Sequence, residues 1–421
     1  MRKPAPRIDS LVLGAGIVGV SIALHLQERG QSVLLVDRRE PGSETSHGNA
    51  GLIERASVIP YAFPRDLRSL LGHATNRSIA VRYRWPHLLR NIPWLTRYWW
   101  HSHPARLSAI GRSILPLIEG CIEEHRRWEC AAGTQQFMRD DGWIELYRSQ
   151  RSLREAEKAA ARLESYRLEH AMLGPEALAK VEPAIQPGTV AGAIHWRDPW
   201  TVGDPRAVTR GYAALFTERG GMWRQADAMA VQTDGATWSL SVGDEFWQAK
   251  NAVIALGPWS GDLCARLGYR FPLAVKRGYH MHYEMLSIDS LKHPICDADA
   301  GFVISPMDGG IRLTTGVELA ARDAPPDHWQ IDQAEDLARR ILPLGRRLDA
   351  EPWRGARPCL PDMLPIIGQA PRHPGLWLAF GHAHHGFTLG PMTGRLLAEM
   401  LTNLAPFADP GPFSPLRFRH S

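Results

Sequence analysis

The sequence predicts an α/β protein, α+β overall, with two domains, on three observations. Residues 8–37 follow a strand, helix and strand pattern around a G-x-G-x-x-G turn, as in a dinucleotide-binding βαβ unit. Residues 60–190 change to long helical patterns such as RSLREAEKAAARLESYRLEH, and alternating strand patterns return at 272–284 and 302–318. The 421 residues are long enough for about two domains.

The first unit ends in an acid, Asp37. IDSLVLGAG is typical of a buried strand entering a turn, IVGVSIALHLQERG of a helix ending at Gly30, and QSVLLVD of a second buried strand. Gly14 permits the turn, Gly16 lets the backbone approach a pyrophosphate, and Gly19 lets helix and strand pack closely. The helix N-terminus favours phosphate, and Asp37 can accept hydrogen bonds from ribose hydroxyls.

This segment has two other interpretations. A glycine turn can serve packing alone, but here strand, helix, second strand and terminal acid occur in register. MRKPAPR followed by an apolar run also has the outline of a secretory signal. The three glycines and the second apolar run, VLLVD, argue against a signal. The apolar stretch is also too short and glycine-rich for a transmembrane helix.

The stretch after the second strand favours a flavin dinucleotide. REPGSETSHGNAGLI shows no immediate crossover helix, and its small residues at 45–51 would let the backbone pass close to a flat ring. An ordinary polar loop is the alternative. No second G-x-G-x-x-G motif follows, so we expect one bound dinucleotide.

Composition limits the partners and the compartment. A net charge of +5 fits an anionic substrate, a membrane surface or neither. The sequence has no zinc-finger spacing and no long lysine run, which are patterns typical of nucleic-acid binding, so we expect no nucleic-acid partner. The five cysteines are scattered, without a C-x-x-C pair, so we expect no disulfide framework, no zinc site and a cytoplasmic location.

Seven motifs carry a family resemblance: GAGIVG, PGSETSHGNAGLI, AVIALGPWSGDL (252–263), PLAVKRGYH (272–280), GIRLTTGVE (310–318), WRGARPCLPDMLPIIG (353–368) and GHAHHGFTLGPMTG (381–394). With them the chain resembles the FAD-dependent D-amino-acid oxidase superfamily. The resemblance is closest to the D-amino-acid dehydrogenase branch, with glycine oxidase and sarcosine oxidase as further relatives. It covers nearly the whole chain.

The resemblance implies a glutathione-reductase-like FAD-binding Rossmann domain assembled from residues 1–60, 195–265 and 350–421. It implies a substrate-binding domain with a large mixed β-sheet from 61–194 and 266–349. We expect non-covalent FAD, because Cys359 does not match the position of the cysteine that holds flavin covalently in some relatives.

The expected cofactor contacts combine the glycine turn with the resemblance. A strand, LWLAFG, and a helix, PMTGRLLAEMLTNL, flank the loop GHAHHGFTLGP. There the backbone of residues 386–389 would meet the flavin, and helix-start N–H groups would stabilise negative charge on the reduced ring. A capped helix without ligand is the alternative. The full set is Gly14, Gly16, Ile17, Val18, Gly19, Asp37, Arg38, Thr45, Ser46, Asn49, Ala50, Gly51, Leu52, Ala230, Ala255, Gly257, Trp259, Gly355, Gly386, Phe387, Thr388 and Leu389.

Arg357 is the expected substrate anchor. It is the one cation in GARPCLPDMLPIIG, where Asp362 is the one acid. The family resemblance places its carboxylate-binding arginine at this G-x-R-P position, and a guanidinium can grip a carboxylate with two parallel hydrogen bonds. The alternative is a structural ion pair with Asp362, because an isolated buried arginine is costly.

Three further pocket residues are expected. His384 falls where glycine oxidases carry a second cation, so it is a candidate for a carboxylate contact or proton relay, and equally for a structural histidine. Tyr279 and Phe302 are expected as pocket walls. Relatives often carry tyrosine where Phe302 stands, so one carboxylate contact would be missing. Histidines 382, 384 and 385 lack carboxylate support in sequence, so we expect no metal.

Residues 81–107 hold four tryptophans, two tyrosines and five arginines. Tryptophan and tyrosine favour membrane interfaces and arginine favours anionic head groups, so this segment is a candidate for peripheral contact with the inner face of the cytoplasmic membrane. The alternative is a helix pair that packs its aromatic side chains inside the protein, since two prolines break any continuous amphipathic helix.

The leading hypothesis is an enzyme that dehydrogenates a D-amino acid, with D-proline or a hydroxyproline as candidates, and passes electrons to a quinone or another acceptor. One rival is a glycine or sarcosine oxidase that uses oxygen and releases hydrogen peroxide. The other is a non-catalytic FAD-bearing subunit of a hetero-oligomer. The partners expected are thus a small amino acid and an electron acceptor; the oligomeric state is left open.

Overall fold

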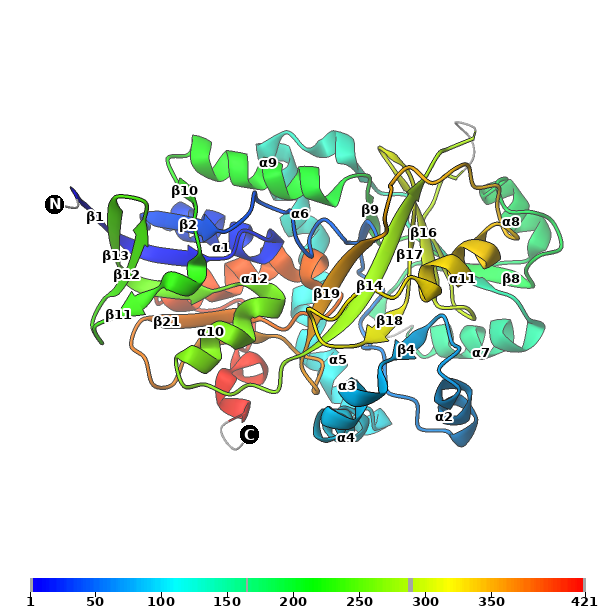
Figure 1. The fold of residues 1–421 in the computed structure, drawn as a ribbon. Helices are drawn as coiled ribbons and strands as arrows, with labels where there is room; N and C mark the ends of the chain where they lie inside the picture. Colours follow the sequence, from blue (N-terminus) through cyan, green and yellow to red (C-terminus); the bar gives the residue numbers. More distant parts are fainter. Residues whose placement is uncertain (1–2, 164–165, 287–290, 419–421) are drawn as a thin grey trace.

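The computed structural model describes residues 3–163, 166–286 and 291–418. Its named strands form one eight-stranded, one ten-stranded and one three-stranded sheet. In Figure 1 the eight-stranded sheet lies on the left and most of the ten-stranded sheet on the right, with the long strands β14 and β19 crossing the middle. The predicted fold class is confirmed: helices and a mostly parallel sheet at one end, and a large mixed sheet at the other.

The eight-stranded sheet has a parallel core. It runs in the order β10 (Met222–Gln225), β2 (Val33–Asp37), β1 (Lys3–Leu13) and β13 (Glu245–Ile254), and β13 also pairs in parallel with β21 (Leu376–Phe380). Strands β2 and β21 and the last residues of β1 and β13 are nearly continuous apolar runs, because both faces of the sheet are covered there. Three antiparallel strands complete the sheet, β12 (Trp238–Val242), β11 (Gln232–Thr233) and β20 (Ile366–Gln369).

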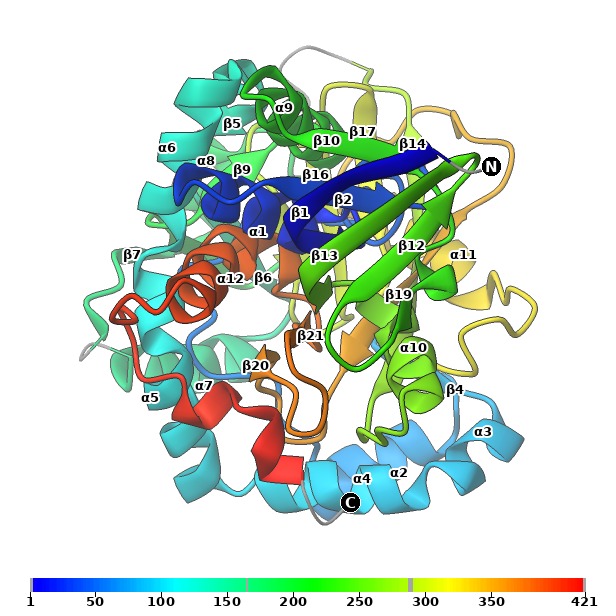
Figure 2. The same cartoon turned by 90° about the vertical axis from the view of Figure 1, so that its left-hand side faces the viewer.

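Helix α1 (Ile17–Glu28) packs between α12 (Gly386–Leu401) and α9 (Pro205–Glu218), and the three helices lie together beside the parallel strands in Figure 2. The helices α1 and α12 approach closely because Gly394 has no side chain. A Cβ there would lie 2.7 Å from the backbone carbon of Ser21. The first helix and both flanking strands were predicted, and Gly30 follows the helix with a φ of +76°.

Helix α12 begins at Gly386, five residues before the predicted start at Pro391. A proline inside a helix has no N–H for the carbonyl four residues earlier, which here is Phe387 O. The ring of His125 on α6 (Cys121–Ala132) occupies that carbonyl instead, with Nε2 at 2.9 Å. The helix therefore starts at the cofactor loop because a distant side chain replaces its missing hydrogen bond.

The ten-stranded sheet is mixed. Its order is β4-β18-β14-β17-β16-β15-β6-β8-β7, and β19 pairs with β14. The pairs β15–β6 and β18–β4 are parallel, and the other pairs are antiparallel. The strands are β4 (Val81–Tyr83), β6 (Trp143–Tyr147), β7 (His170–Leu173), β8 (Gly192–Trp196), β14 (Ala274–Tyr283), β15 (Ile295–Asp297), β16 (Phe302–Met307), β17 (Gly310–Thr314), β18 (Val317–Leu319) and β19 (Trp353–Cys359).

The small third sheet, β3 (Leu52–Ile53), β9 (Trp200–Val202) and β5 (Met138–Arg139), anchors the segment that follows the small-residue loop. Two patterns end differently from expectation. The helical pattern over 151–170 gives α7 (Gln150–Ala161), and residues 170–173 form β7 instead. Strand β19 falls in a range assigned to the FAD-binding domain, yet it pairs along its whole length with β14 of the mixed sheet. The domain boundaries themselves stay a prediction.

The aromatic segment 81–107 has both buried and exposed aromatic side chains, so internal packing accounts for only part of it. Its prolines separate α3 (Trp85–Arg90) from α4 (Ile92–His101), and α5 (Pro104–Glu119) follows. Three of the aromatic side chains, those of Tyr83, Trp94 and Tyr98, are buried, and those of Trp85, Trp99 and Trp100 are 56%, 38% and 54% exposed. None of the described helices is long and apolar enough to cross a membrane.

Candidate active site

A cavity of about 1410 Å³ is lined from both large sheets. This volume exceeds the 300–1,000 Å³ of ordinary small-ligand pockets and leaves space for a dinucleotide and a small substrate together. Most predicted site residues meet in its wall, far apart as they are in sequence. They are Gly16, Ile17, Val18, Asp37, Arg38, Thr45, Ser46, Asn49, Ala50, Leu52, Ala255, Gly257, Trp259, Tyr279, Phe302, Gly355, Arg357, His384, Gly386 and Phe387.

The glycine turn at one end of the cavity depends on absent side chains. A Cβ at Gly14 would lie 2.3 Å from Ala255 O, and one at Gly19 would lie 1.8 Å from Gly14 O. Both glycines therefore lie behind the wall, as packing positions. Asp37 is fixed over the turn because its Oδ2 accepts from Ala15 N at 2.8 Å.

The cavity wall fits a dinucleotide in a second way, because two helices begin at it. The N-cap residues, Gly16 of α1 and His385 of α12, form no side-chain cap, and neither helix has an acid in its first turn. At α1, Ser46 Oγ accepts from the first helical N–H, that of Ile17, at 3.0 Å. The remaining N–H groups and the positive end of each helix dipole favour phosphate and a reduced, anionic ring. At this end Arg38 also lies over the ring of Trp259, 4.2 Å from its centroid.

The small-residue loop bends sharply before β3. Asn49 Oδ1 accepts from Gly51 N at 2.8 Å and from Leu52 N at 3.1 Å. Gly51 has a φ of +77°, and a Cβ there would lie 2.5 Å from Val202 O. Gly51 shapes the loop from behind the cavity wall, while Asn49, Ala50 and Leu52 reach the wall itself.

Three further predicted contacts lie outside the wall. The wall near Ala230 is formed by the preceding residues, 227–229. Leu389 is fully buried in the core. Thr388 turns its hydroxyl to the β3 segment, where its Oγ1 accepts from Glu54 N at 3.0 Å. Their proposed backbone roles at the flavin stay predictions.

Arg357 projects from β19 into the cavity. Its Nη1 donates to Gly316 O at 3.0 Å and its Nη2 lies 3.5 Å from Thr315 O, so these two carbonyls orient the guanidinium. No carboxylate among the described residues forms an ion pair with it. Burial lowers the pKa of Arg357, which marks a cation that still lacks an anionic partner.

The alternative partner of Arg357, Asp362, is taken by another arginine. Arg417 Nε donates to Asp362 Oδ2 at 2.6 Å, and Arg417 Nη2 donates to Leu364 O at 2.7 Å. The alternative, a structural pair between Arg357 and Asp362, is therefore not formed. Space for the Arg357 guanidinium comes from Gly278 on the paired strand β14, where a Cβ would lie 2.7 Å from Nη1.

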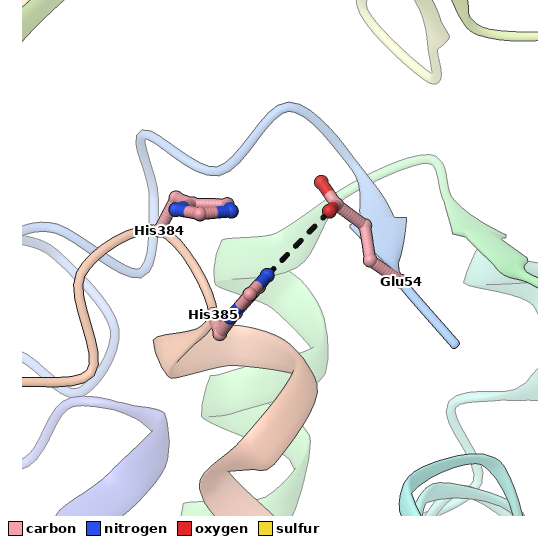
Figure 3. A group of neighbouring side chains, drawn as sticks. All are labelled: Glu54, His384 and His385. Carbon is pink, nitrogen blue, oxygen red and sulfur yellow. Dashed lines mark ion pairs between the residues drawn. The ribbon is translucent and has the colours of Figure 1, made fainter. Parts of the chain in front are cut away.

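Two histidines from the loop before α12 meet Glu54 in the cavity wall (Figure 3). His385 Nε2 lies 3.8 Å from Glu54 Oε2, and the rings of His384 and His385 are 3.8 Å apart between centroids. Burial lowers the pKa of His385 to about 4 and the pKa of His384 well below its ordinary value. Both imidazoles are therefore neutral near pH 7, and the Nε2 atom of each has no hydrogen-bond partner among the described residues.

Tyr279 and Phe302 line the cavity as expected of walls. The Tyr279 hydroxyl donates to Glu318 Oε2 at 2.6 Å and accepts from Asp327 N at 3.0 Å, so only its ring is available. Phe302 is 1% exposed. The thiol of Cys359 also reaches the wall, but burial raises its pKa and it donates to Arg357 O at 3.4 Å.

Sequence reasoning missed several cavity residues, chiefly Glu54, Glu145, Lys276 and Trp353. Trp353 occupies a slot between two glycines and stacks on His280, with ring centroids 4.7 Å apart. The signal for Glu54 was available: it is an acid directly after an apolar strand that leaves the small-residue loop. Glu145, an acid among apolar residues in GWIELYR, gave a similar signal.

Comparison with known proteins places this site in a family. Residues 9–400 match the DAO family, described as FAD dependent oxidoreductase. A D-amino-acid oxidase from Bradyrhizobium diazoefficiens is 29% identical over 417 residues, which cover 97% of this chain and 98% of that protein. A D-amino acid dehydrogenase from Xylella fastidiosa strain M12 is 30% identical over 410 residues, which cover 93% and 91%.

Solved structures share the fold. Glycine oxidase from Geobacillus kaustophilus superimposes with a TM-score of 0.75 at 18% identity, over 97% of this chain and 98% of that chain. L-proline dehydrogenase from P. horikoshii gives a TM-score of 0.75 at 16% identity, over 99% and 98%. The expected cofactor, FAD, is confirmed by the family. With a glycine turn, two helix N-termini at the cavity wall and a match over most of its length, the chain belongs to the FAD dependent oxidoreductase family.

Proposed function

We propose that this protein oxidises a D-amino acid at its Cα–N bond. The observation that carries the proposal is Arg357, a guanidinium without a carboxylate partner in the cavity that the flavin must share. The D configuration is proposed because the two sequence relatives are a D-amino-acid oxidase and a D-amino acid dehydrogenase. Bound FAD supplies the redox chemistry by accepting a hydride from Cα.

Arg357 orients the substrate by its carboxylate. A guanidinium has five N–H donors, and two carbonyls engage at most two of them, so a carboxylate can still bind through two parallel bonds. The apolar neighbours of the cavity exclude water and strengthen this contact. The ring of Phe302 adds apolar surface and no hydrogen bond.

Within the D-amino acids, we propose D-proline and hydroxy-D-proline as the substrates. The support is the pair of unpartnered Nε2 atoms of His384 and His385, which line the same cavity as Arg357 and offer hydrogen bonds to the ring hydroxyl of hydroxy-D-proline. Neutral imidazoles suit an uncharged hydroxyl better than a charged side chain.

The test is an anaerobic panel of D- and L-amino acids, glycine and sarcosine, scored by bleaching of the flavin absorbance. We expect D-isomers to bleach it, and cyclic ones fastest. Reduction by glycine or sarcosine alone would favour the oxidase alternative, and reduction by none would favour a non-catalytic subunit. Comparing oxygen with a quinone analogue as acceptor, and measuring hydrogen peroxide, identifies the electron acceptor.

Arg357→Leu tests the anchor itself. We expect the affinity for the active amino acid to fall about 100-fold or more, because its carboxylate would enter the cavity unpaired. FAD occupancy and the melting temperature should stay close to wild type, since no described ion pair is broken. The control is Arg354→Leu on the same strand, whose exposed side chain points away from the cavity. Equal affinities in both variants would contradict the proposal.

We propose, further, that the cavity mouth rests on an anionic membrane surface and receives a quinone there. The apolar rim, defined as Leu67, Leu71, Trp85, Leu89, Ile92, Trp99 and Trp100, is exposed on α2 (Leu67–Ala74), α3 and α4. Figures 1 and 2 place these three helices together at one side of the molecule. Trp85, Leu89 and Ile92 also line the cavity.

Arginines accompany the rim, which suits anionic head groups. Arg65 lies over Trp99 at 4.0 Å and Arg106 over Trp100 at 3.7 Å from the ring centroids. We expect wild type to sediment with phosphatidylglycerol vesicles in a salt-sensitive way, and a Trp99→Ser, Trp100→Ser double variant to lose most of this binding. Leu404→Ser, at a distant exposed position, is the control. Equal sedimentation of all three proteins would refute the membrane contact.

A further inference from the structure

Glu54 is a carboxyl in the cavity wall, and among the described residues it has no lysine or arginine partner. It follows β3, and its backbone N–H is held by Thr388 Oγ1 at the start of α12. Its side chain is 16% exposed, and Ser57 donates a short hydrogen bond to Oε2. No lysine or arginine among the described residues pairs with it, and its nearest basic group is His385.

The groups around Glu54 are mostly neutral near pH 7. Burial raises the pKa of Cys121 to about 12 and raises the pKa of Cys296, while the two histidines of Figure 3 have lowered pKa values. Two ionisable groups of other kinds act on Glu54, the Glu145 carboxyl on β6 and the Arg357 guanidinium on β19. Burial raises the pKa of Glu54 itself, and Glu145 adds to the increase.

Glu145 is the other carboxyl of the cavity wall, but it is already engaged. Its Oε2 accepts from Trp196 Nε1 at 3.1 Å, and it also bonds the Tyr147 side chain. In the part of the chain that the structure describes, no donor forms a hydrogen bond with Glu54 Oε1. Of the two carboxyls, Glu54 is therefore the one with an oxygen available for a ligand.

Glu54 and Arg357 are complementary. One is an acid without a cation, the other a cation without an acid, and both line the same cavity within reach of each other's charge. An amino acid is a zwitterion with its charges on adjacent groups. Binding the substrate carboxylate at Arg357 and its ammonium at Glu54 would give both protein charges a partner in one step. An unpaired charge buried in the cavity costs free energy, so this pairing favours a zwitterion.

We propose that Glu54 binds the amino group of the substrate and takes one proton from it before oxidation. This inference rests on the proposed amino-acid function and deepens it. The transfer breaks one N–H bond of the ammonium and forms an O–H bond at Glu54 Oε1, while the electron pair stays on nitrogen. The ammonium and carboxylate thereby become a neutral amine and a carboxylic acid, and the amine lone pair becomes free to assist loss of hydride from Cα.

The environment of Glu54 suits this task. A carboxyl with a raised pKa is a stronger base once ionised, so it competes better for an ammonium proton than an exposed glutamate does. Ser57 holds Oε2 and leaves Oε1 to face the ligand. Residues 384 and 385 supply no positive charge that would repel the ammonium.

The test uses holoenzyme and the D-amino acid that bleaches the flavin fastest in the panel, with its amine-free carboxylic acid as a second ligand. Binding of both is read from the perturbation of the flavin spectrum and from thermal shift. We expect Glu54→Gln to bind the amine-free acid within about twofold of wild type and the amino acid at least tenfold more weakly. Arg357→Leu should lose both ligands.

The pH profile gives a second readout. In wild type the rate of flavin reduction should rise with pH as Glu54 ionises, and in Glu54→Gln it should rise only as the substrate amine itself loses its proton, at higher pH. Ser57→Ala keeps the carboxyl but removes its donor, so it should shift the wild-type limb to higher pH. This variant keeps the test open should Glu54→Gln fold poorly.

The matched control is Glu129→Gln. Glu129 is also a buried carboxyl with a raised pKa, but it lies on α6 outside the cavity wall. It should leave ligand binding and the pH profile unchanged. Wild-type reduction by no amino acid would overturn the proposed function. Normal wild-type reduction with unchanged amino-acid affinity and pH profile in Glu54→Gln would overturn only the role of Glu54.

Discussion

Gly278→Ala should displace the substrate anchor, because its new methyl group meets the Arg357 guanidinium in the cavity wall. Gly278 lies on β14 opposite Gly355 of β19, and its φ does not require glycine, so alanine fits the backbone. The new Cβ would lie 2.7 Å from Nη1, 2.8 Å from Nη2 and 2.9 Å from Cζ of Arg357. Ordinary contact begins at 3.4 Å, so the guanidinium must move by about 0.7 Å.

That displacement sets the size of the effect. The Arg357 Nη1 bond to Gly316 O is 3.0 Å long, near the middle of the favourable range, and a shift of this size takes it or the substrate bond beyond that range. One hydrogen bond to a charged group contributes about 1.5–3 kcal/mol. We therefore expect the dissociation constant of the amino acid to rise about 10- to 100-fold.

The assay is ligand titration of the oxidised holoenzyme, followed by steady-state kinetics. KM should rise in parallel with the dissociation constant, whereas FAD occupancy should stay unchanged. Gly261→Ala is the control, because its Cβ would meet Leu273 at an ordinary 3.4 Å. If Gly278→Ala bound the amino acid as tightly as wild type, Arg357 would not be the group that sets affinity.

The remaining predictions concern stability. Burial raises the pKa of Glu129 to about 7, so the folded state loses stability as pH rises through that value. The free energy of unfolding of Glu129→Gln should therefore exceed that of wild type at about pH 8 and differ little from it at about pH 4. Urea titration at both pH values measures this difference. Equal gains at both pH values would contradict this. Gly48→Ala would place a Cβ 2.0 Å from the Trp353 ring, so we expect a loss of about 1–3 kcal/mol and reduced FAD retention, whereas Gly309→Ala, in open space, should melt like wild type.

Local patterns predicted what depends on local physics. The turn at Gly14 and Gly19 could be predicted because the strand, the helix and the acid Asp37 follow one another in sequence. The motif predicted the position of Arg357 but not its neighbours, because Gly278 on β14 and Gly316 between β17 and β18 lie tens of residues away in sequence. The ion pair between Arg417 and Asp362 could not be predicted either, since no sequence pattern links the two residues.

The same reason explains the errors in the elements. The start of α12 depends on His125, which lies more than 250 residues earlier and supplies the donor that Pro391 lacks. The assignment of β19 depends on its pairing with β14, because a strand carries no mark of the sheet it will join. Glu54 and His385 meet through the third sheet and the loop before α12, so their proximity is a property of the tertiary structure alone.

The ion pair between Arg417 and Asp362 affects the charge near Arg357, which lies five residues before Asp362 in the same motif. By holding the one acid of GARPCLPDMLPIIG, the short turn at residues 415–418 keeps that acid from competing with incoming carboxylates. Arg417, which lies outside the cavity wall, thus neutralises an acid near the carboxylate site and favours the binding of anions at Arg357. Substitution of Arg417 should therefore weaken inhibition by simple organic acids.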